Sequence, residues 1–212
     1  MLGRLSNETR AQLLKLGTAR TYGHDKPILE QGASNDHVVV VLRGTVKVVA
    51  YSEYGPALLA IRVRGDLVGE QAGIDKNPRS ASVIACGEVL VRTIPLNELK
   101  RLPDVDHQVQ RMVSERWRSS DQLRVDFFGR NARARLARVL IEIATMGGWQ
   151  AEPRWELKIP LTRAELGSLA SMKAGTAEKQ MRLLIVEGLV AADQQRITLL
   201  DTDALRLIAE ST

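Results

Sequence analysis

Residues 21–95 of this 212-residue chain limit its fold most strongly, because they form short β-branched or alternating apolar runs separated by glycines. The runs are VVVVLRG, TVKVVAY, ALLAIRV, SASVIA and VLVRTI, and the glycines between them are Gly32, Gly44, Gly55, Gly65, Gly69, Gly73 and Gly87. Strands this short, with turn residues this close together, are typical of an all-β sandwich or barrel of the jelly-roll kind. No run alternates with a long helix and there is no Gly-rich phosphate loop, so a parallel nucleotide-binding sheet is not favoured.

Helical patterns flank this β region. LSNETRAQLLKLG predicts a short helix capped by Ser6 or Asn7 and ended by Gly17. A short helical piece at 97–101 precedes a helix at about 104–128, whose apolar positions are Val105, Val109, Met112, Val113, Trp117, Leu123 and Phe127. This stripe is wide enough to face both the β domain and a second copy of the chain. We interpret it as a dimerisation helix; the alternative is a helix packed wholly within one chain.

Gly129 interrupts the helical pattern, and we place the domain boundary there. Residues 1–128 are predicted to form one domain that includes the dimerisation helix, and residues 129–212 a second one. Asn131 can cap the next helix, ARARLARVLIEIATM, which Gly147 and Gly148 would end.

The second domain carries the strongest local signal. Thr162 and Glu165 match the S/T-x-x-E capping box, and Leu161 and Leu166 are placed for a hydrophobic staple. After a break at residues 171–173, a second helical pattern begins at Ala177 and stops at Gly188, with Ala177, Met181, Leu184 and Ile185 predicted to be buried. Two short helices joined by a three-residue turn form a helix-turn-helix, in which Gly167 and Ala177 would let the helices cross closely.

LVAADQQRITLL follows as a predicted β-hairpin with a polar turn at residues 193–195, which gives the winged form. The second helix would enter the DNA major groove. Lys179 and Arg182 can donate to guanine or phosphate, and Glu178 can accept from cytosine. The full predicted DNA-binding set is Thr162, Arg163, Lys173, Ala174, Gly175, Thr176, Glu178, Lys179 and Arg182. The alternative is an ordinary helical hairpin with a solvated charged face.

Composition and charge narrow the class of protein. Apolar residues make up 44 % of the chain, enough for a core, and the net charge is +5. Residues 111–138 hold eight arginines against three acidic residues, which favours an acidic partner. Residues 1–15 lack the apolar core of a secretory signal, and no window is long and apolar enough to span a bilayer. We therefore expect a cytoplasmic protein that does not enter a membrane.

An enzyme or a metal protein is not expected. His24, His37 and His107 are scattered, and the single cysteine, Cys86, lies in no recognisable motif with them. One cysteine cannot form an intrachain disulfide or, by itself, hold an iron-sulfur cluster, so we expect Cys86 to be a small core residue.

The stretch VGEQAGIDKNPRSASV, residues 68–83, combines a glutamate with an arginine nine positions later. A carboxylate accepts hydrogen bonds from hydroxyls, whereas a guanidinium offers a fork of donors suited to a phosphate. A ribose phosphate would satisfy both groups. The alternative is a polar loop between two strands.

The order of these parts, together with ILEQG, VLRGTVKV, GDLVGE, PRSASV, LTRAELGSLA and EGLV, resembles the cyclic AMP receptor protein and FNR (CRP/FNR) family of bacterial transcription regulators. The resemblance covers nearly the whole chain. It implies an α+β fold with an N-terminal jelly-roll β-roll that binds a cyclic nucleotide, a long dimerisation helix and a C-terminal winged helix-turn-helix. The implied partners are double-stranded DNA, a second copy of the chain and RNA polymerase.

The resemblance also assigns the ligand site. Glu70 would accept from the ribose 2′-hydroxyl, while Arg79 and Ser80 would hold the cyclic phosphate with backbone N–H groups near Gly69 and Ala81. The base would lie against the long helix, beside Arg116, Ser119, Ser120 and Asp121 of either chain. The expected allosteric ligand is cyclic AMP or another cyclic nucleotide, and no metal is expected.

Three alternatives stay open. The regulator could bind cyclic GMP or a cyclic dinucleotide, it could be active without a ligand, or the chain could be an architectural DNA binder held by charge. The sequence also departs from the family: Ala174, Gly175 and Lys179 stand where members that read the TGTGA half-site have an Arg-Glu pair and an arginine, and Gln71 replaces an apolar residue. We therefore do not expect the usual operator.

Overall fold

The computed structural model describes residues 1–146, 150–151, 154–193 and 196–211. The chain divides into two compact units. The first comprises Met1–Pro56 and Ala60–Ser120, and the second comprises Ala57–Leu59 and Asp121–Thr212. Among the helices so described, none has the length and the apolar character needed to cross a membrane.

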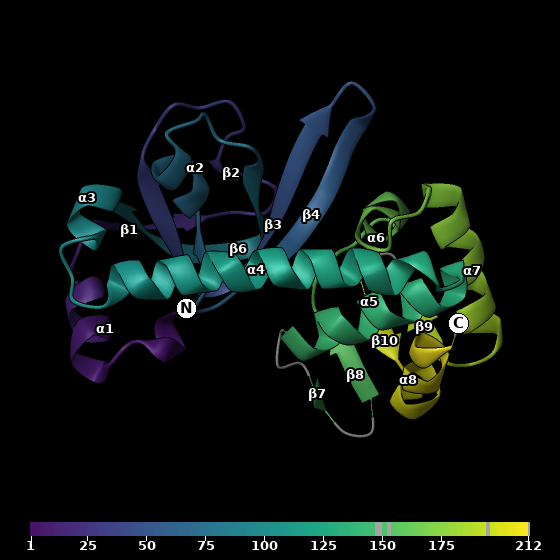
Figure 1. The fold of residues 1–212 in the computed structure, drawn as a ribbon. Helices are drawn as coiled ribbons and strands as arrows, with labels where there is room; N and C mark the ends of the chain where they lie inside the picture. The colour runs from purple at the N-terminus through teal and green to yellow at the C-terminus, as the bar shows by residue number, and fades with distance from the viewer. Residues whose placement is uncertain (147–149, 152–153, 194–195, 212) are drawn as a thin grey trace. The chain divides into compact units, whose positions relative to one another are not determined.

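The first unit is built on an antiparallel β-roll (Figure 1). The strands of this sheet are β1 (Thr18–Tyr22), β2 (Pro27–Leu29), β3 (His37–Ser52), β4 (Gly55–Val63), β5 (Leu67–Val68) and β6 (Ser82–Pro95), and all of them except residues 57–59 of β4 belong to the first unit. The strand order is β1-β6-β3-β4, with β2 paired to β6 and β5 paired to β3. The predicted β-roll is confirmed, although the region also contains one short helix between β5 and β6.

Strand β3 is longer than the sequence pattern indicated. VVVVLRG and TVKVVAY form the single strand β3, whose pairing with β6 shifts register on both sides of Arg43. Gly44 has φ +87°, and a Cβ at this position would lie 2.6 Å from the carbonyl oxygen of Glu88. The glycine therefore bends the strand instead of ending it.

The first unit also contains helices. They are the 3₁₀ turn η1 (Leu2–Arg4), α1 (Asn7–Leu13), α2 (Glu70–Asp75), α3 (Leu96–Leu99) and the first part of α4 (Val105–Phe128). Ser6 caps α1 by accepting a hydrogen bond from the Thr9 amide. Val105, Val109 and Met112 pack into a core cluster with residues of α1 and the sheet. The short helix α2 was not predicted, and Cys86 is half-buried, so placing it in the core was wrong.

Helix α4 changes character along its length. The side chains that face away from its packed positions include Trp117, Val125 and Phe128, which are exposed, whereas Phe127 is buried. Exposed apolar side chains on a long helix are compatible with a contact to another chain. The dimerisation role stays a prediction.

The second unit, in its described residues, contains a small sheet, the end of α4 and further helices. Its elements are α5 (Ala132–Met146), β7 (Gln150–Ala151), β8 (Arg154–Leu157), α6 (Arg163–Leu169), α7 (Ala174–Val186), β9 (Val190–Ala192), β10 (Ile197–Leu199) and α8 (Thr202–Glu210). The sheet order is β7-β8-β10-β9. The predicted hairpin is confirmed as β9 and β10, while β7, β8 and α8 were not predicted. Asn131 caps α5 through the Ala134 amide, as expected.

The predicted ends of two segments fall on residues that the structure does not describe. Gly147 and Gly148, expected to end α5, lie outside the described residues, as do residues 194 and 195 of the predicted hairpin turn.

Helices α6 and α7 form the predicted helix-turn-helix. Both hydrogen bonds of the Thr162–Glu165 capping box are present. Ser171 in the turn has φ +51°, and a Cβ on Gly167 would lie 2.7 Å from the Met172 carbonyl oxygen. At Gly167, α6 therefore lies close to the backbone of the turn that leads to α7.

Two details of α7 differ from the prediction. The helix begins at Ala174, one turn earlier than the apolar pattern indicated, because the first turn is exposed and carries no apolar signal. Ile185 is 37 % exposed, so its predicted burial was wrong. Ala177, Met181 and Leu184, spaced by four and three residues, form the buried stripe, and Ile185 lies at its edge.

Candidate functional site

Arg79 lies at the centre of the predicted ligand site and is only 4 % exposed. Its Nε donates to Asn35 Oδ1 at 2.9 Å, and its Nη2 donates to the same oxygen at 2.6 Å and to the His37 carbonyl. Its Nη1 donates to the Gly69 carbonyl. The guanidinium thus joins the start of β3 to the turn before α2.

The hydrogen-bond acceptors of the Arg79 guanidinium are neutral: Asn35 Oδ1 and the carbonyl oxygens of Gly69 and His37. Burial lowers the pKa of Arg79, and the nearby charges of Asp36 and Glu70 partly oppose that shift. Among the described residues, no carboxylate forms an ion pair with this guanidinium. A buried cation whose hydrogen-bond partners are all neutral leaves local positive potential, which an anion would stabilise.

Glu70, the first residue of α2, follows Gly69, whose φ is +83°. Its side chain is almost fully buried, and Oε1 accepts a hydrogen bond from Arg116 Nη1 at 2.6 Å. Arg116 also donates from Nη2 to the Leu67 carbonyl at 2.8 Å. Since Arg116 belongs to α4, this partly buried ion pair connects the long helix to the segment that carries Glu70.

Gly69 fits closely beside Arg79. A Cβ at this position would lie 2.7 Å from Arg79 Nη1 and 2.7 Å from Leu29 Cδ1. Glycine is therefore required both by the positive φ and by the space that the guanidinium occupies.

Hydrogen bonds link Arg79 to the Gly69 carbonyl and Arg116 to Glu70, the residue next to Gly69, so four residues of the predicted ligand site lie together; their roles in binding stay predictions. Ser80 is exposed and Ala81 is half-buried, both just before β6. Ser119, Ser120 and Asp121 are exposed on α4, where Asp121 lies 3.5 Å from Arg124 Nη1. Their roles stay predictions.

Asn35 and the backbone carbonyl of His37 were missed by the sequence reasoning. Asn35 lies 44 residues before Arg79, so no local spacing links the two. Burial, followed by the charge of Arg79, lowers the pKa of His37.

The predicted DNA-binding surface lies on the second unit. Lys173, Ala174, Gly175, Lys179 and Arg182 are exposed, opposite the buried stripe of α7. Gly175, Lys179, Arg182, Leu183 and Val186 line a hollow of about 290 Å³ along this face. The helix therefore offers an accessible surface with basic side chains and little bulk at its N-terminal end.

Glu178 lies beside this face and contacts two arginines. Its Oε2 accepts from Arg163 Nε at 2.8 Å, and its Oε1 accepts from Arg182 Nε at 3.1 Å. The hydrogen bonds from Arg182 and Arg163 lower the pKa of the Glu178 carboxyl. Glu178 therefore stays ionised and joins the first turn of α6 to the middle of α7.

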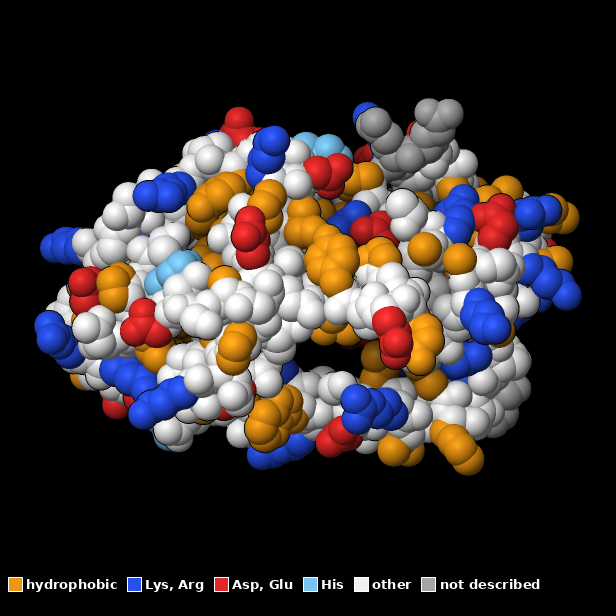
Figure 2. Space-filling model, turned by 90° about the horizontal axis from the view of Figure 1, so that it is seen from above, with side chains coloured by type: hydrophobic (Ala, Val, Ile, Leu, Met, Phe, Trp, Pro, Cys, Tyr) orange, Lys and Arg blue, Asp and Glu red, His pale blue; other side chains and the backbone are white. Residues whose placement is uncertain are grey.

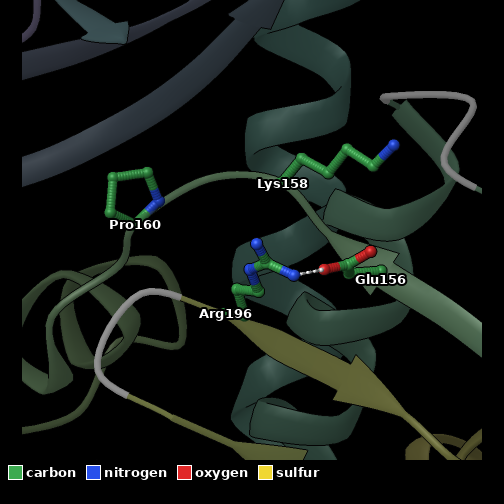
Figure 3. A pocket seen from close by; sticks show the side chains of 4 residues that line it. All are labelled: Glu156, Lys158, Pro160 and Arg196. Carbon is green, nitrogen blue, oxygen red and sulfur yellow. Dashed lines mark hydrogen bonds and ion pairs between the residues drawn. The ribbon is translucent and has the colours of Figure 1, made fainter.

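A second hollow, of about 410 Å³, lies beside the small sheet and is lined by Glu156, Lys158, Pro160 and Arg196 (Figure 3). Arg196 Nη1 donates to Glu156 Oε1 at 3.2 Å, while Lys158 extends away from this pair. Lys158 is exposed four residues before Thr162, the cap of α6. Lys158, which directly follows β8, is thus a basic residue close in sequence to the helix-turn-helix.

The arginine excess in residues 111–138 is reduced by ion pairs. Arg111 pairs with Glu115, Arg116 with Glu70, Arg124 with Asp121, Arg133 with Glu187 and Arg138 with Asp126. On the face drawn in Figure 2, Lys and Arg side chains are interspersed with acidic ones and do not merge into one patch. This arrangement does not favour DNA binding by undirected charge alone. Within the described residues, no cluster of three or more His, Cys, Asp or Glu could hold a metal ion.

The chain matches two family descriptions: the cyclic nucleotide-binding domain over residues 19–106, and the Crp-like helix-turn-helix domain over residues 134–208. A cyclic AMP receptor protein of Thermus thermophilus is 29 % identical over 177 residues, which cover 81 % of this chain and 78 % of the relative.

Two solved structures share the fold. One is a transcriptional regulator of the CRP/FNR family from Thermus thermophilus, with a TM-score of 0.78 and 23 % identity over 92 % of this chain and 99 % of that one. The other is a c-di-GMP responsive global regulator of Xanthomonas campestris, with a TM-score of 0.75 and 18 % identity over 92 % and 99 % of the two chains.

A β-roll of the cyclic-nucleotide-binding type and a winged helix-turn-helix in one chain define a DNA-binding transcription regulator with a cyclic nucleotide-binding domain. The chain belongs to the CRP/FNR family of bacterial transcription regulators. The α+β architecture expected from the resemblance is confirmed.

Proposed function

We propose that this regulator binds a cyclic nucleotide, with cyclic AMP as the first candidate, and in response binds operator DNA as a homodimer. The observation that carries the proposal is Arg79, a buried guanidinium with neutral hydrogen-bond partners only. A cyclic phosphate supplies the missing negative charge and several strong acceptors. The cyclic AMP receptor protein among the relatives supports this choice of ligand.

The ligand would use groups that the chain has already brought together. The phosphate would take over donors of Arg79 that now serve Gly69, Asn35 and His37, with help from Ser80 and the amides near Gly69 and Ala81. The ribose 2′-hydroxyl would donate to Glu70. The base would lie along α4, beside Arg116, Ser119, Ser120 and Asp121.

Ligand binding at Glu70 would affect α4, because Glu70 is hydrogen-bonded to Arg116 of that helix. Its carboxylate now accepts from Arg116, so a ribose hydroxyl either shares this acceptor or displaces the arginine. Both outcomes would weaken or remove the Glu70–Arg116 ion pair that restrains α4. This helix contains residues of both units. The ligand shifts the protein toward the DNA-binding state only by as much as it prefers that state.

The DNA-binding half of the proposal follows from two-fold symmetry. In a homodimer, two α7 helices about 34 Å apart would reach successive major grooves and select a palindromic operator. The proposed contacts are Thr162, Arg163, Lys173, Ala174, Gly175, Thr176, Lys179 and Arg182, with Glu178 at their edge. RNA polymerase is the further partner that such a regulator would contact, in the cytoplasm.

Isothermal titration calorimetry with cyclic AMP, cyclic GMP and cyclic di-GMP tests the ligand. We expect cyclic AMP to bind the wild-type chain and to lose most of its affinity with Glu70→Gln and with Arg79→Ala. Arg43→Ala is the control, because Arg43 is an exposed arginine of the same unit that pairs with Glu88. Equal binding by wild type and Arg79→Ala would refute the pocket.

A second candidate is a regulator of the same fold that responds to another ligand, or to none. It is favoured by one observation: Nε, Nη1 and Nη2 of Arg79 already have acceptors within the chain. The structural similarity to a c-di-GMP responsive regulator supports the ligand variant. A signal with cyclic di-GMP alone, or no signal with any of the three nucleotides while palindromic DNA still binds, would favour this candidate.

A further inference from the structure

The exposed face of α7 divides into a central stripe and an edge. Gly175, Lys179, Arg182 and Val186 follow one another at intervals of four, three and four residues, opposite the buried stripe, and line one hollow with Leu183. No atom lies within 4 Å of the position that a Cβ on Gly175 would take. The stripe therefore allows the helix backbone to approach a groove closely, and it contains two cationic side chains.

Glu178 lies at the edge of this stripe, and both its oxygens are engaged within the chain. One accepts from Arg163 in the first turn of α6, and the other accepts from Arg182 in the stripe. A carboxylate that accepts from two guanidinium groups gains more from these charge-assisted bonds than from a single neutral amino group of cytosine.

These contacts leave the outer ends of both arginines available. In each case Nε donates to Glu178, so this contact does not use the two terminal amino groups of Arg182, whose side chain is 74 % exposed. A pair of terminal amino groups is the fork that matches O6 and N7 of guanine. The same arrangement on Arg163, at the start of α6, suits a backbone phosphate.

We infer that Glu178 is a positioning residue for sequence discrimination: it holds Arg182 in the orientation that reads a base and Arg163 in the orientation that meets a phosphate, and it does not itself read cytosine. The inference rests on the operator binding proposed above. It assigns the base-reading part of this helix to Arg182 and Lys179, where Ala174 and Gly175 offer no polar side chain.

Glu178→Gln separates this role from direct base reading, because the amide keeps the size of the side chain, removes the negative charge and replaces one of the two accepting oxygens by an NH2 donor. Neither arginine would then have a charge-assisted hydrogen bond, and Arg182 would be held less firmly in one direction. Preference for the base pair that it reads should fall roughly 5- to 150-fold. Binding to unrelated DNA should become tighter, with a log-log salt slope steeper by up to about one, because a phosphate-facing guanidinium is no longer neutralised.

The experiment is a selection of binding sites from random double-stranded DNA by the full-length protein with cyclic AMP, repeated without it. Each base pair of the selected site is then varied and binding is measured for wild type, Glu178→Gln, Arg182→Ala and the double variant. Glu187→Gln is the charge-matched control: it removes one negative charge at the end of the same helix, where Glu187 pairs with Arg133.

We expect Glu178→Gln, Arg182→Ala and the double variant to lose preference at the same base pair, and Glu187→Gln to keep it. Loss of preference with Glu178→Gln at a base pair that Arg182→Ala still reads would overturn the inference, because Glu178 would then read that base itself. Unchanged preferences with Glu178→Gln would also overturn it. A wild-type selection with no preferred sequence would instead overturn the operator binding on which the inference rests.

Discussion

Replacing Gly69 by alanine tests the pocket geometry, and Gly32→Ala provides a matched control. The two glycines have almost the same backbone angle, φ +83° and φ +82°. Around Gly32 nothing lies within 4 Å of an added Cβ, whereas at Gly69 the Cβ would lie 2.7 Å from both Arg79 Nη1 and Leu29 Cδ1. Both alanine variants therefore have the same backbone strain, but only Gly69→Ala places a Cβ against Arg79.

The expected free energies of unfolding follow from these distances. A left-handed conformation costs an alanine about 1–2 kcal/mol, and the loss of glycine's freedom in the unfolded chain returns about 0.4–1 kcal/mol. Gly32→Ala should thus destabilise by roughly 0–1.6 kcal/mol. Gly69→Ala adds overpacking of about 1–3 kcal/mol, because Arg79 is buried and held by Asn35 and His37 and cannot simply swing away.

Scanning calorimetry of the full chain, followed by titration with cyclic AMP, checks both parts. Gly69→Ala should unfold at a lower temperature than Gly32→Ala. It should also bind cyclic AMP roughly 10- to 150-fold more weakly, since a displaced Arg79 forfeits charge-assisted hydrogen bonds worth about 1.5–3 kcal/mol. Equal stability and equal affinity in the two variants would refute the reasoning, because the ligand site would then not depend on where Arg79 lies.

Three further predictions concern other parts of the chain. Thr162→Ala should destabilise the second unit by about 1 kcal/mol in thermal unfolding, because the capping bond to the Glu165 amide is lost, while Thr162→Ser should stay close to wild type. His37 has a folded pKa below its usual value, so the unfolded chain binds a proton more readily. The stability that His37 contributes should be complete above about pH 6.5 and fall as the pH drops from there toward the folded pKa; a His37→Gln variant that kept the full acid dependence would contradict this assignment. Gly17→Ala should destabilise the first unit by several kcal/mol in denaturant unfolding, at least about 2, since its Cβ would collide with the Thr93 carbonyl at φ +58°, and a fully stable variant would show that the α1–β1 turn can relax.

The features predictable from sequence are those with local signals. The Thr162–Glu165 capping box, the Asn131 cap and the glycine-punctuated strands depend on residues within a few positions of one another, and all three are found in the structure. The start of α7 at Ala174 was missed because an exposed first turn carries no apolar periodicity. The bend at Gly44 was taken for a break because a glycine that bends a strand and one that ends it look alike in sequence.

The candidate site shows the same limit. Glu70 and Arg79 were predicted together because they share one short segment and a family motif. Asn35 was not predicted, since its contact with Arg79 spans 44 residues and forms only when the turn before β3 closes on the segment before β6. The Glu70–Arg116 pair joins residues 46 positions apart, and nothing in the local spacing indicates it. Contacts of this kind depend on tertiary structure.

The central claim is that a cyclic nucleotide bound at Glu70 and Arg79 controls DNA binding, and fluorescence anisotropy tests it most directly. The probe is a labelled duplex of the sequence selected by the wild-type protein, titrated with and without saturating cyclic AMP, in the wild type and in Glu70→Gln. The account predicts that cyclic AMP tightens binding by roughly 5- to 150-fold in the wild type and not in the variant, and that DNA tightens cyclic AMP binding by the same factor. The same DNA affinity with and without the nucleotide would contradict it.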